Sequence, residues 1–177
     1  TPKVMGVLNL TPDSFFDGGK FFRKDNSFDE SKIINSIESM IEDGADFIDI
    51  GAQSTKPGFT QISSSEELDR LGFIFDKLND YPVLFSIDTF NYEVIKEAIN
   101  KKIDLINNVF SFSDQESFKL VCRNDIPICV CHQGNPDNKE DIFSQINLFF
   151  SDVEEKFEKE KFNTDNIIFD PGFGYGK

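Results

Sequence analysis

Short apolar runs alternate with amphipathic segments along the whole chain. The six apolar runs span residues 4–10, 47–52, 83–89, 105–109, 127–132 and 166–170. Each run is rich in Ile, Val or Phe and shows no regular alternation of apolar and polar residues, which is typical of parallel strands that are buried on both faces. The pattern therefore predicts six parallel strands.

The segments between these strands are predicted to be helices. Apolar residues recur in them at helical spacing, most clearly in a stripe after the fifth strand that consists of Ile142, Ile146, Phe149, Phe150, Val153 and Phe157. A serine is followed by a glutamate three positions later at 27–30, 64–67 and 113–116. This spacing fits a capping box, in which the two side chains satisfy backbone N–H groups at a helix start. Three helices are therefore expected to begin at these serines.

Six strands and five helices in alternation predict a parallel α/β fold with right-handed crossovers. A doubly wound open sheet and a (βα)₈ barrel both fit this order. Polar residues follow nearly every strand, among them Asn9, Asp88, Asn107 and Asp170. A doubly wound sheet gathers its site at one switch point, whereas a barrel brings all its strand ends to one ring. The spread favours a (βα)₈ TIM barrel, of which residues 1–177 would form one partial domain with about the first six βα units.

The charge and cysteine content of the chain limit its partners. The formal net charge is −14, and phosphate backbones are bound by Lys and Arg, so neither nucleic acid nor an acidic membrane surface is expected as a partner. No apolar run approaches the length of a membrane span. Three cysteines and no secretion signal favour a reducing cytoplasm over a disulfide framework.

The polar strand ends carry candidate chemistry. Asn9 and the loop "NLTPDSFFDGG" offer oxygens that suit a hard cation such as Mg²⁺, although an ordinary turn explains them equally well. The segment "QSTKPG" at 53–58 combines hydroxyl groups and a cation, which suits a phosphate-binding site. Asp88 and Asp170 end apolar strands, where a carboxylate is costly unless it is hydrogen-bonded. They suit the N–H donors of a guanidine-like or pterin ring, and pairing with neighbouring backbone or a lysine remains the alternative.

The segment Cys129-Val-Cys131-His132 resembles a zinc-binding sequence only superficially. In a strand the two cysteines face one side and the histidine faces the other, so one tetrahedral ion would not collect all three. We therefore expect the cysteines to pack in the core or against the helices.

Three long segments, "MGVLNLTPDSFFDGG", "GADFIDIGAQSTKPG" and "DPGFGYGK", resemble the signature segments of dihydropteroate synthase. The shorter segments "SIDTF", "INNV" and "CHQGNP" fall between them in the order and spacing of that family. The resemblance covers the chain from end to end. It implies a (βα)₈ barrel of folate biosynthesis that joins p-aminobenzoate to dihydropterin hydroxymethyl pyrophosphate and releases pyrophosphate with the help of Mg²⁺.

The resemblance also assigns roles residue by residue. Asn9 is similar to the metal and pyrophosphate ligand. The matches in the substrate-binding and catalytic positions are Thr55, Lys56 and Pro57 in the second segment, Asp88, Asn107 and Asp170 around the pterin, and Phe15 in a loop that folds over the substrates. Asp88 and Asp170 are the two expected catalytic residues. Family members are commonly homodimers when full length, and their partners are small-molecule substrates.

The chain departs from the family pattern at several positions. Lys56 stands where arginine is usual and keeps the charge without the bidentate fork. Gln53 and Asn108 stand where the family has carboxylates. The family also carries a pocket lysine and a Ser-x-Arg segment in two later βα units, so this chain alone is expected to be catalytically incomplete. A degenerate, non-catalytic pterin-binding barrel and a methyltetrahydrofolate-dependent corrinoid methyltransferase remain alternative functions.

Overall fold

The computed structural model describes residues 2–11, 21, 28–54, 60–133 and 141–173. One parallel sheet runs through these residues in the strand order β1-β2-β3-β4-β5-β6. The strands are β1 (Met5–Asn9), β2 (Phe47–Gly51), β3 (Leu84–Asp88), β4 (Leu105–Asn108), β5 (Ile128–Cys131) and β6 (Ile167–Asp170). The six predicted strands are thus confirmed, with ends that differ from the expected ones by at most one residue.

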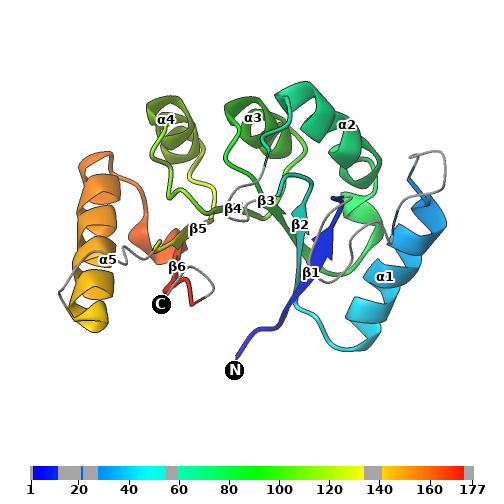
Figure 1. Cartoon of the computed structure of the whole chain (residues 1–177), viewed down its shortest axis with the longest axis horizontal. Coiled ribbons are helices and arrows are strands. Elements are labelled where there is room, and N and C mark those ends of the chain that lie inside the picture. The colour runs from blue at the N-terminus through cyan, green and yellow to red at the C-terminus, as the bar shows by residue number, and fades with distance from the viewer. Residues whose placement is uncertain (1, 12–20, 22–27, 55–59, 134–140, 174–177) are drawn as a thin grey trace.

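The helices cover one side of this sheet. They are α1 (Glu30–Glu42), α2 (Ser64–Phe75), α3 (Tyr92–Asn100), α4 (Gln115–Asn124) and α5 (Ile142–Lys159), with the short 3₁₀ turns η1 (Leu78–Asp80) and η2 (Thr164–Asn166). In Figure 1 the helices form an arc outside the strands, and the inner side of the sheet is open. None of the helices in the described ranges is long and apolar enough to cross a membrane.

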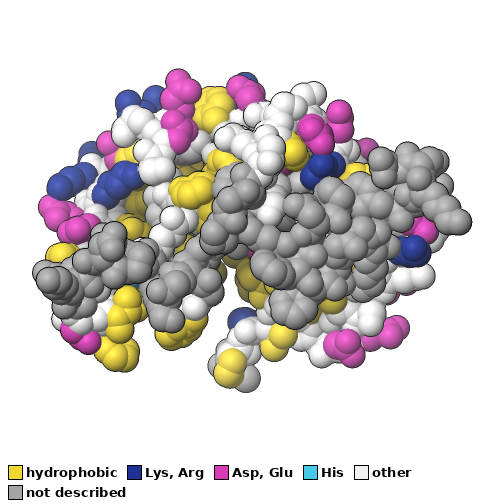
Figure 2. Space-filling view, in the orientation of Figure 1, with side chains coloured by type: hydrophobic (Ala, Val, Ile, Leu, Met, Phe, Trp, Pro, Cys, Tyr) yellow, Lys and Arg dark blue, Asp and Glu magenta, His cyan; other side chains and the backbone are white. Residues whose placement is uncertain are grey.

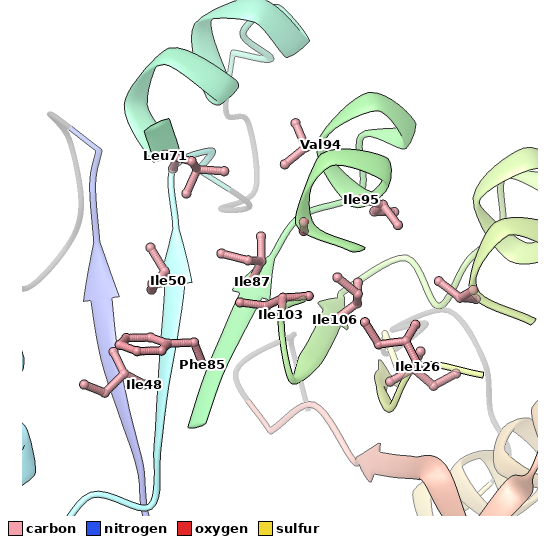
Figure 3. Close-up of a cluster of buried hydrophobic side chains, with 14 of the residues drawn as sticks. Ile48, Ile50, Leu71, Phe85, Ile87, Val94, Ile95, Ile103, Ile106 and Ile126 are labelled. Atoms are coloured by element: carbon pink, nitrogen blue, oxygen red, sulfur yellow. The ribbon is translucent and has the colours of Figure 1, made fainter. Parts of the chain in front are cut away.

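The core lies between the sheet and this arc of helices. Ile48 and Ile50 on β2, Ile87 on β3 and Ile106 on β4 are fully buried and belong to one cluster with Val94 and Ile95 of α3 and Leu71 of α2 (Figure 3). Because side chains alternate along a strand, the residues between these isoleucines point to the other face of the sheet. That inner face carries the polar residues of the strand ends.

The inner face of the sheet is open in this chain. Four apolar residues that alternate with buried ones on their strands are exposed by 39% to 53% of their surface, namely Met5, Val7, Leu84 and Ile168. Figure 2 shows hydrophobic side chains on this open side, while acidic and basic side chains intermingle along the helical rim. An inner face with this much exposed apolar surface fits a barrel that is represented by six of its eight βα units.

The helix starts differ from the predicted capping boxes. The first helix begins after Asp29, whose side chain makes no capping hydrogen bond, and residue 27 lies outside the described part. Helix α2 begins at Ser64 as expected, but its N-cap is Ser63, whose side chain accepts from the backbone N–H of Glu66 at 3.1 Å. Helix α4 begins one residue late, because Asp114 accepts from Ser117 N at 2.8 Å. Aspartate caps helices as well as serine does, so the Ser–Glu spacing predicted the helices correctly and their capping residues wrongly.

Candidate active site

Four of the strand-end positions form one row across the inner face. The strand register pairs Asn9 with Gly51, Gly51 with Asp88, and Asp88 with Asn107. Cys129 continues the row on β5 as the partner of Asn107. Parallel strands place residues of one register row side by side with the same facing. The structure therefore brings together the predicted residues Asn9, Asp88 and Asn107.

Gly51 leaves a gap in the middle of this row. A Cβ atom at this position would lie 3.3 Å from Asn9 Oδ1 and 3.7 Å from Asp88 Oδ2. The space between the amide oxygen of Asn9 and the carboxylate of Asp88 is thus kept free of side-chain atoms by a glycine. We did not predict Gly51 from the sequence, although a glycine inside a strand is a known sign of close approach by a ligand or another backbone.

The carboxylate of Asp88 is buried in an unfavourable environment for a negative charge. Its Oδ1 atom is buried and has no hydrogen-bond partner among the described residues. Burial raises the pKa of Asp88 well above its usual value, and the nearby carboxylates of Asp49 and Glu67 raise it further. A buried acceptor without a partner is costly to a folded protein, so it marks a place where a donor from a ligand would be favourable.

Asp49 is a second buried carboxylate beneath the row. Its side chain is 7% exposed, and its Oδ2 atom accepts a hydrogen bond from Asn107 Nδ2 at 3.0 Å. Burial raises the pKa of Asp49, while the side chains of Ser86 and Asn107 act in the opposite direction. We did not predict this residue from the sequence, although a single charge inside the apolar run "FIDIG" is the same signal that identified Asp88.

Asp170 ends β6 at the far side of the sheet from β1. Its side chain is exposed, and Oδ1 accepts from the backbone N–H of Gly172 at 2.8 Å. The alternative in which this carboxylate pairs with neighbouring backbone is therefore partly realised. One bond of this kind leaves further acceptor sites on the same carboxylate, because its two oxygens have about four lone-pair directions.

Cys129 of β5 lies between β4, which carries Asn107, and β6, which ends at Asp170. Burial raises the pKa of its thiol to about 12, and the negative charges of Asp170, Asp49 and Asp88 contribute. Cys129 lies in register with Asn107 on the inner face of the sheet, so of the two expected places, the core and the helix-facing side, it does not take the helix-facing one. A raised pKa favours the protonated thiol of Cys129 over the thiolate, which is the nucleophilic form of cysteine.

Two departures from the family pattern have structural roles in the adjoining loops. The carbonyl of Gln53 accepts from Ile62 N at 2.8 Å, and its amide donates to Ser54 O at 2.8 Å. Asn108 Oδ1 accepts from Phe110 N at 3.0 Å and shapes the turn after β4. Gln53 uses both a donor and an acceptor, which a glutamate would not supply. Phe15, Thr55, Lys56 and Pro57 lie outside the described residues.

A buried hydrogen-bond network supports the site from behind. Glu67 of α2 is completely buried and accepts a hydrogen bond from Asn91 Nδ2. Asn91 lies in the loop that follows β3, two residues after Thr89. Arg70 donates from Nη1 to Ala52 O at 2.8 Å after β2. The network therefore ties α2 to the loops that follow β2 and β3, where Gly51 and Asp88 end their strands.

Replacing Glu67 with glutamine is expected to stabilise the protein at neutral pH. Burial raises the pKa of Glu67 above its usual value, against the opposing effects of Thr89, Asn91 and Arg70. The folded state thus holds this proton more tightly than the unfolded state, so stability is lost as the pH rises through the folded pKa. Glutamine can still accept from Asn91 and carries no charge.

Urea unfolding at pH 4 and pH 7 measures this effect. The variant should have the higher midpoint at pH 7, and its advantage should shrink at pH 4. Glu66→Gln is the matched control, because Glu66 is exposed on the same helix and pairs with Arg70 at 2.7 Å. An equal gain in both variants, or a gain that does not depend on pH, would contradict the prediction.

A parallel α/β barrel that gathers acidic and amide side chains at its strand ends defines a class of small-molecule-binding barrel proteins. The chain belongs to the pterin binding enzyme family, whose model matches residues 5–177. A dihydropteroate synthase of Clostridium beijerinckii is 36% identical over 182 residues, which cover 98% of this chain and 63% of that protein. The dihydropteroate synthase of Escherichia coli (strain K12) is 34% identical over 184 residues, with 99% and 63% coverage.

Solved structures give the same result. The Yersinia pestis dihydropteroate synthase in a sulfonamide drug complex matches with a TM-score of 0.88 and 33% identity, over 99% of this chain and 64% of that one. The Xanthomonas albilineans dihydropteroate synthase with 4-aminobenzoic acid matches with a TM-score of 0.84 and 30% identity, over 99% and 63%. The prediction of a TIM barrel with about six βα units is thereby confirmed. The chain spans 63% of the length of both curated relatives named above.

Proposed function

We propose that this chain supplies the pterin-binding part of a dihydropteroate synthase. Such an enzyme condenses p-aminobenzoate with 6-hydroxymethyl-7,8-dihydropterin pyrophosphate to give 7,8-dihydropteroate and pyrophosphate. The observation that carries the proposal is the register row of Asn9, Gly51, Asp88 and Asn107, with an open gap at Gly51 and an unpartnered carboxylate oxygen on Asp88.

The chemistry of the reaction fits these groups. Departure of pyrophosphate from the pterin methylene leaves positive charge that is delocalised into the ring. Carboxylates fixed beside the ring stabilise this charge and accept hydrogen bonds from its N–H groups, which is the role we assign to Asp88 and Asp170. Asn107, adjacent to Asp88 in the row, contributes an amide to the same ring. No protein nucleophile is needed.

Asn9 is the residue that we assign to Mg²⁺. Its amide oxygen borders the Gly51 gap, and a neutral oxygen at that position suits a hard cation that reaches the site with a phosphate group. Bound Mg²⁺ supplies charge neutralisation for the leaving pyrophosphate. We place Thr55, Lys56 and Pro57 beside the phosphate groups and Phe15 over p-aminobenzoate, on the resemblance of their segments. The homodimer and the cytoplasmic location also remain predictions.

A product assay tests the proposed function. The intact protein is incubated with the pterin pyrophosphate, p-aminobenzoate and Mg²⁺, and dihydropteroate is measured by chromatography together with released pyrophosphate. We expect equal amounts of the two products, and none without p-aminobenzoate. Pterin binding without product would favour the non-catalytic barrel. Methyl transfer from methyltetrahydrofolate to a corrinoid would favour the methyltransferase.

The gap at Gly51 leads to a further prediction. Changing Gly51 to alanine should weaken binding of the pterin pyrophosphate by about tenfold, because the new methyl group would meet Asn9 Oδ1 at 3.3 Å. Isothermal titration measures the affinity. Gly72→Ala is the control, because a Cβ there meets nothing within 4 Å. Unchanged affinity in Gly51→Ala would show that the ligand does not use this gap.

A further inference from the structure

Asp49 and Asn107 meet across an intervening strand. Asp49 lies on β2 and Asn107 on β4, with β3 between them, yet their side chains are joined by a hydrogen bond of 3.0 Å. Asp49 is paired in register with Ser86, and Ser86 with Leu105. Asp49 therefore lies two residues below the row of Gly51, Asp88 and Asn107, on the same inner face. The contact exists because the sheet curves and brings inner side chains of alternate strands together.

The hydrogen bond fixes which way the Asn107 amide points. A carboxylate only accepts hydrogen bonds, so it selects the Nδ2 end of the amide and directs the carbonyl oxygen away from Asp49. A neutral amide at position 49 would not make this selection, since it can donate or accept. The orientation of the Asn107 amide thus depends on the fact that Asp49 can only accept a hydrogen bond, and not only on the shape of the Asp49 side chain.

Asp49 is an unusual choice if it serves stability alone. The side chain is 7% exposed, and its Oδ1 atom is buried without a hydrogen-bond partner among the described residues. A buried carboxylate with one unpartnered oxygen is costly, and a well-packed neutral residue at such a position is often as stable or more so. Packing alone therefore does not explain a carboxylate at position 49.

We propose that Asp49 is a positioning residue for pterin recognition, which holds the Asn107 amide so that its carbonyl oxygen accepts a hydrogen bond from an N–H group of the ring. This inference rests on the proposed function, because it concerns how the same site selects its substrate. Asp49 acts through Asn107 and does not itself touch the ligand. Its removal should therefore matter only while Asn107 is present.

A double-mutant cycle with Asp49→Asn and Asn107→Ala tests this role in the intact protein. The probe is 6-hydroxymethylpterin, titrated by calorimetry. We expect Asp49→Asn to lower pterin affinity by about tenfold in the wild-type background, which is the scale of one hydrogen bond, and to have no further effect beside Asn107→Ala. Its thermal midpoint should equal or exceed that of the wild type. Equal losses in both backgrounds would overturn the proposal, as would unchanged affinity in Asp49→Asn.

Steady-state kinetics provide a second measurement where binding to Asn107→Ala is too weak to titrate. For Asp49→Asn, KM for the pterin pyrophosphate should rise about tenfold while KM for p-aminobenzoate stays unchanged. A general structural defect would instead change both constants or lower the thermal midpoint, and that result would overturn the proposal. If the wild-type protein itself fails to bind 6-hydroxymethylpterin, the proposed function fails. If it binds and the cycle is additive, only the role of Asp49 fails.

Discussion

Replacing Asp88 with asparagine is expected to give a more stable protein that has lost most of its affinity for a pterin. Burial and the charges of Asp49 and Glu67 raise the pKa of Asp88 well above its usual value, so ionising this carboxyl group costs more in the folded protein than in the unfolded chain. The unfolded chain ionises at the ordinary pKa. Stability is therefore lost as the pH rises through the raised folded pKa, and the variant avoids this loss.

The loss of affinity in Asp88→Asn has a different cause. The ligand would donate N–H groups to the carboxylate, and an asparagine replaces one of its two acceptors by a donor. We expect about 10- to 100-fold weaker binding of 6-hydroxymethylpterin, which is the scale of a charge-assisted hydrogen bond. The control is Asp76→Asn, because Asp76 is exposed on the outer surface and pairs with Lys101 at 3.1 Å. Lower stability combined with unchanged affinity would show that Asp88 has a purely structural role.

Asp170→Asn should weaken pterin binding by a similar factor of about 10 to 100 without the gain in stability. The side chain is exposed, and its Oδ1 atom already accepts from Gly172 N at 2.8 Å. Asparagine can keep this bond through its oxygen, and its NH₂ group would then stand where the ring needs an acceptor.

Titration with 6-hydroxymethylpterin measures this effect, and urea unfolding at pH 7 checks stability. Asp165→Asn is the matched control, because Asp165 lies in η2, at the opposite end of β6. An unchanged affinity in Asp170→Asn would mean that the ring is held elsewhere, and an equal loss in Asp165→Asn would indicate a general effect of charge.

The strands and their polar ends were predictable because they depend on local sequence. A run such as that of β2 is apolar apart from Asp49, and its carboxyl end is recognised by the change to polar residues. The positions of Asn9, Asp88 and Asn107 in one row follow from the parallel order of the strands. The capping residues of the helices were predicted less accurately. Ser63 caps α2 in place of Ser64, and Asp114 caps α4 in place of Ser113, because neighbouring serine and aspartate residues cap a helix equally well.

The contacts around these residues depend on curvature and on partners far away in the sequence. Asp49 meets Asn107 across 58 positions and an intervening strand, which no sequence pattern encodes. Gln53 holds the base of its loop through Ile62, nine positions away. Glu67 was expected to cap a helix and is buried against Asn91, 24 positions away. In each case the type of residue was visible in the sequence, and its partner was determined by the tertiary fold.

The most direct test of the account is a crystal structure of the intact protein with 6-hydroxymethylpterin bound. We expect the ring to lie at the carboxyl ends of β3, β4 and β6, with its N–H groups donating to Asp88 and Asp170 and to the carbonyl oxygen of Asn107. The same structure should keep the hydrogen bond from Asn107 Nδ2 to Asp49. A ring bound away from these three residues, with Asp88 Oδ1 still unpartnered, would contradict the account.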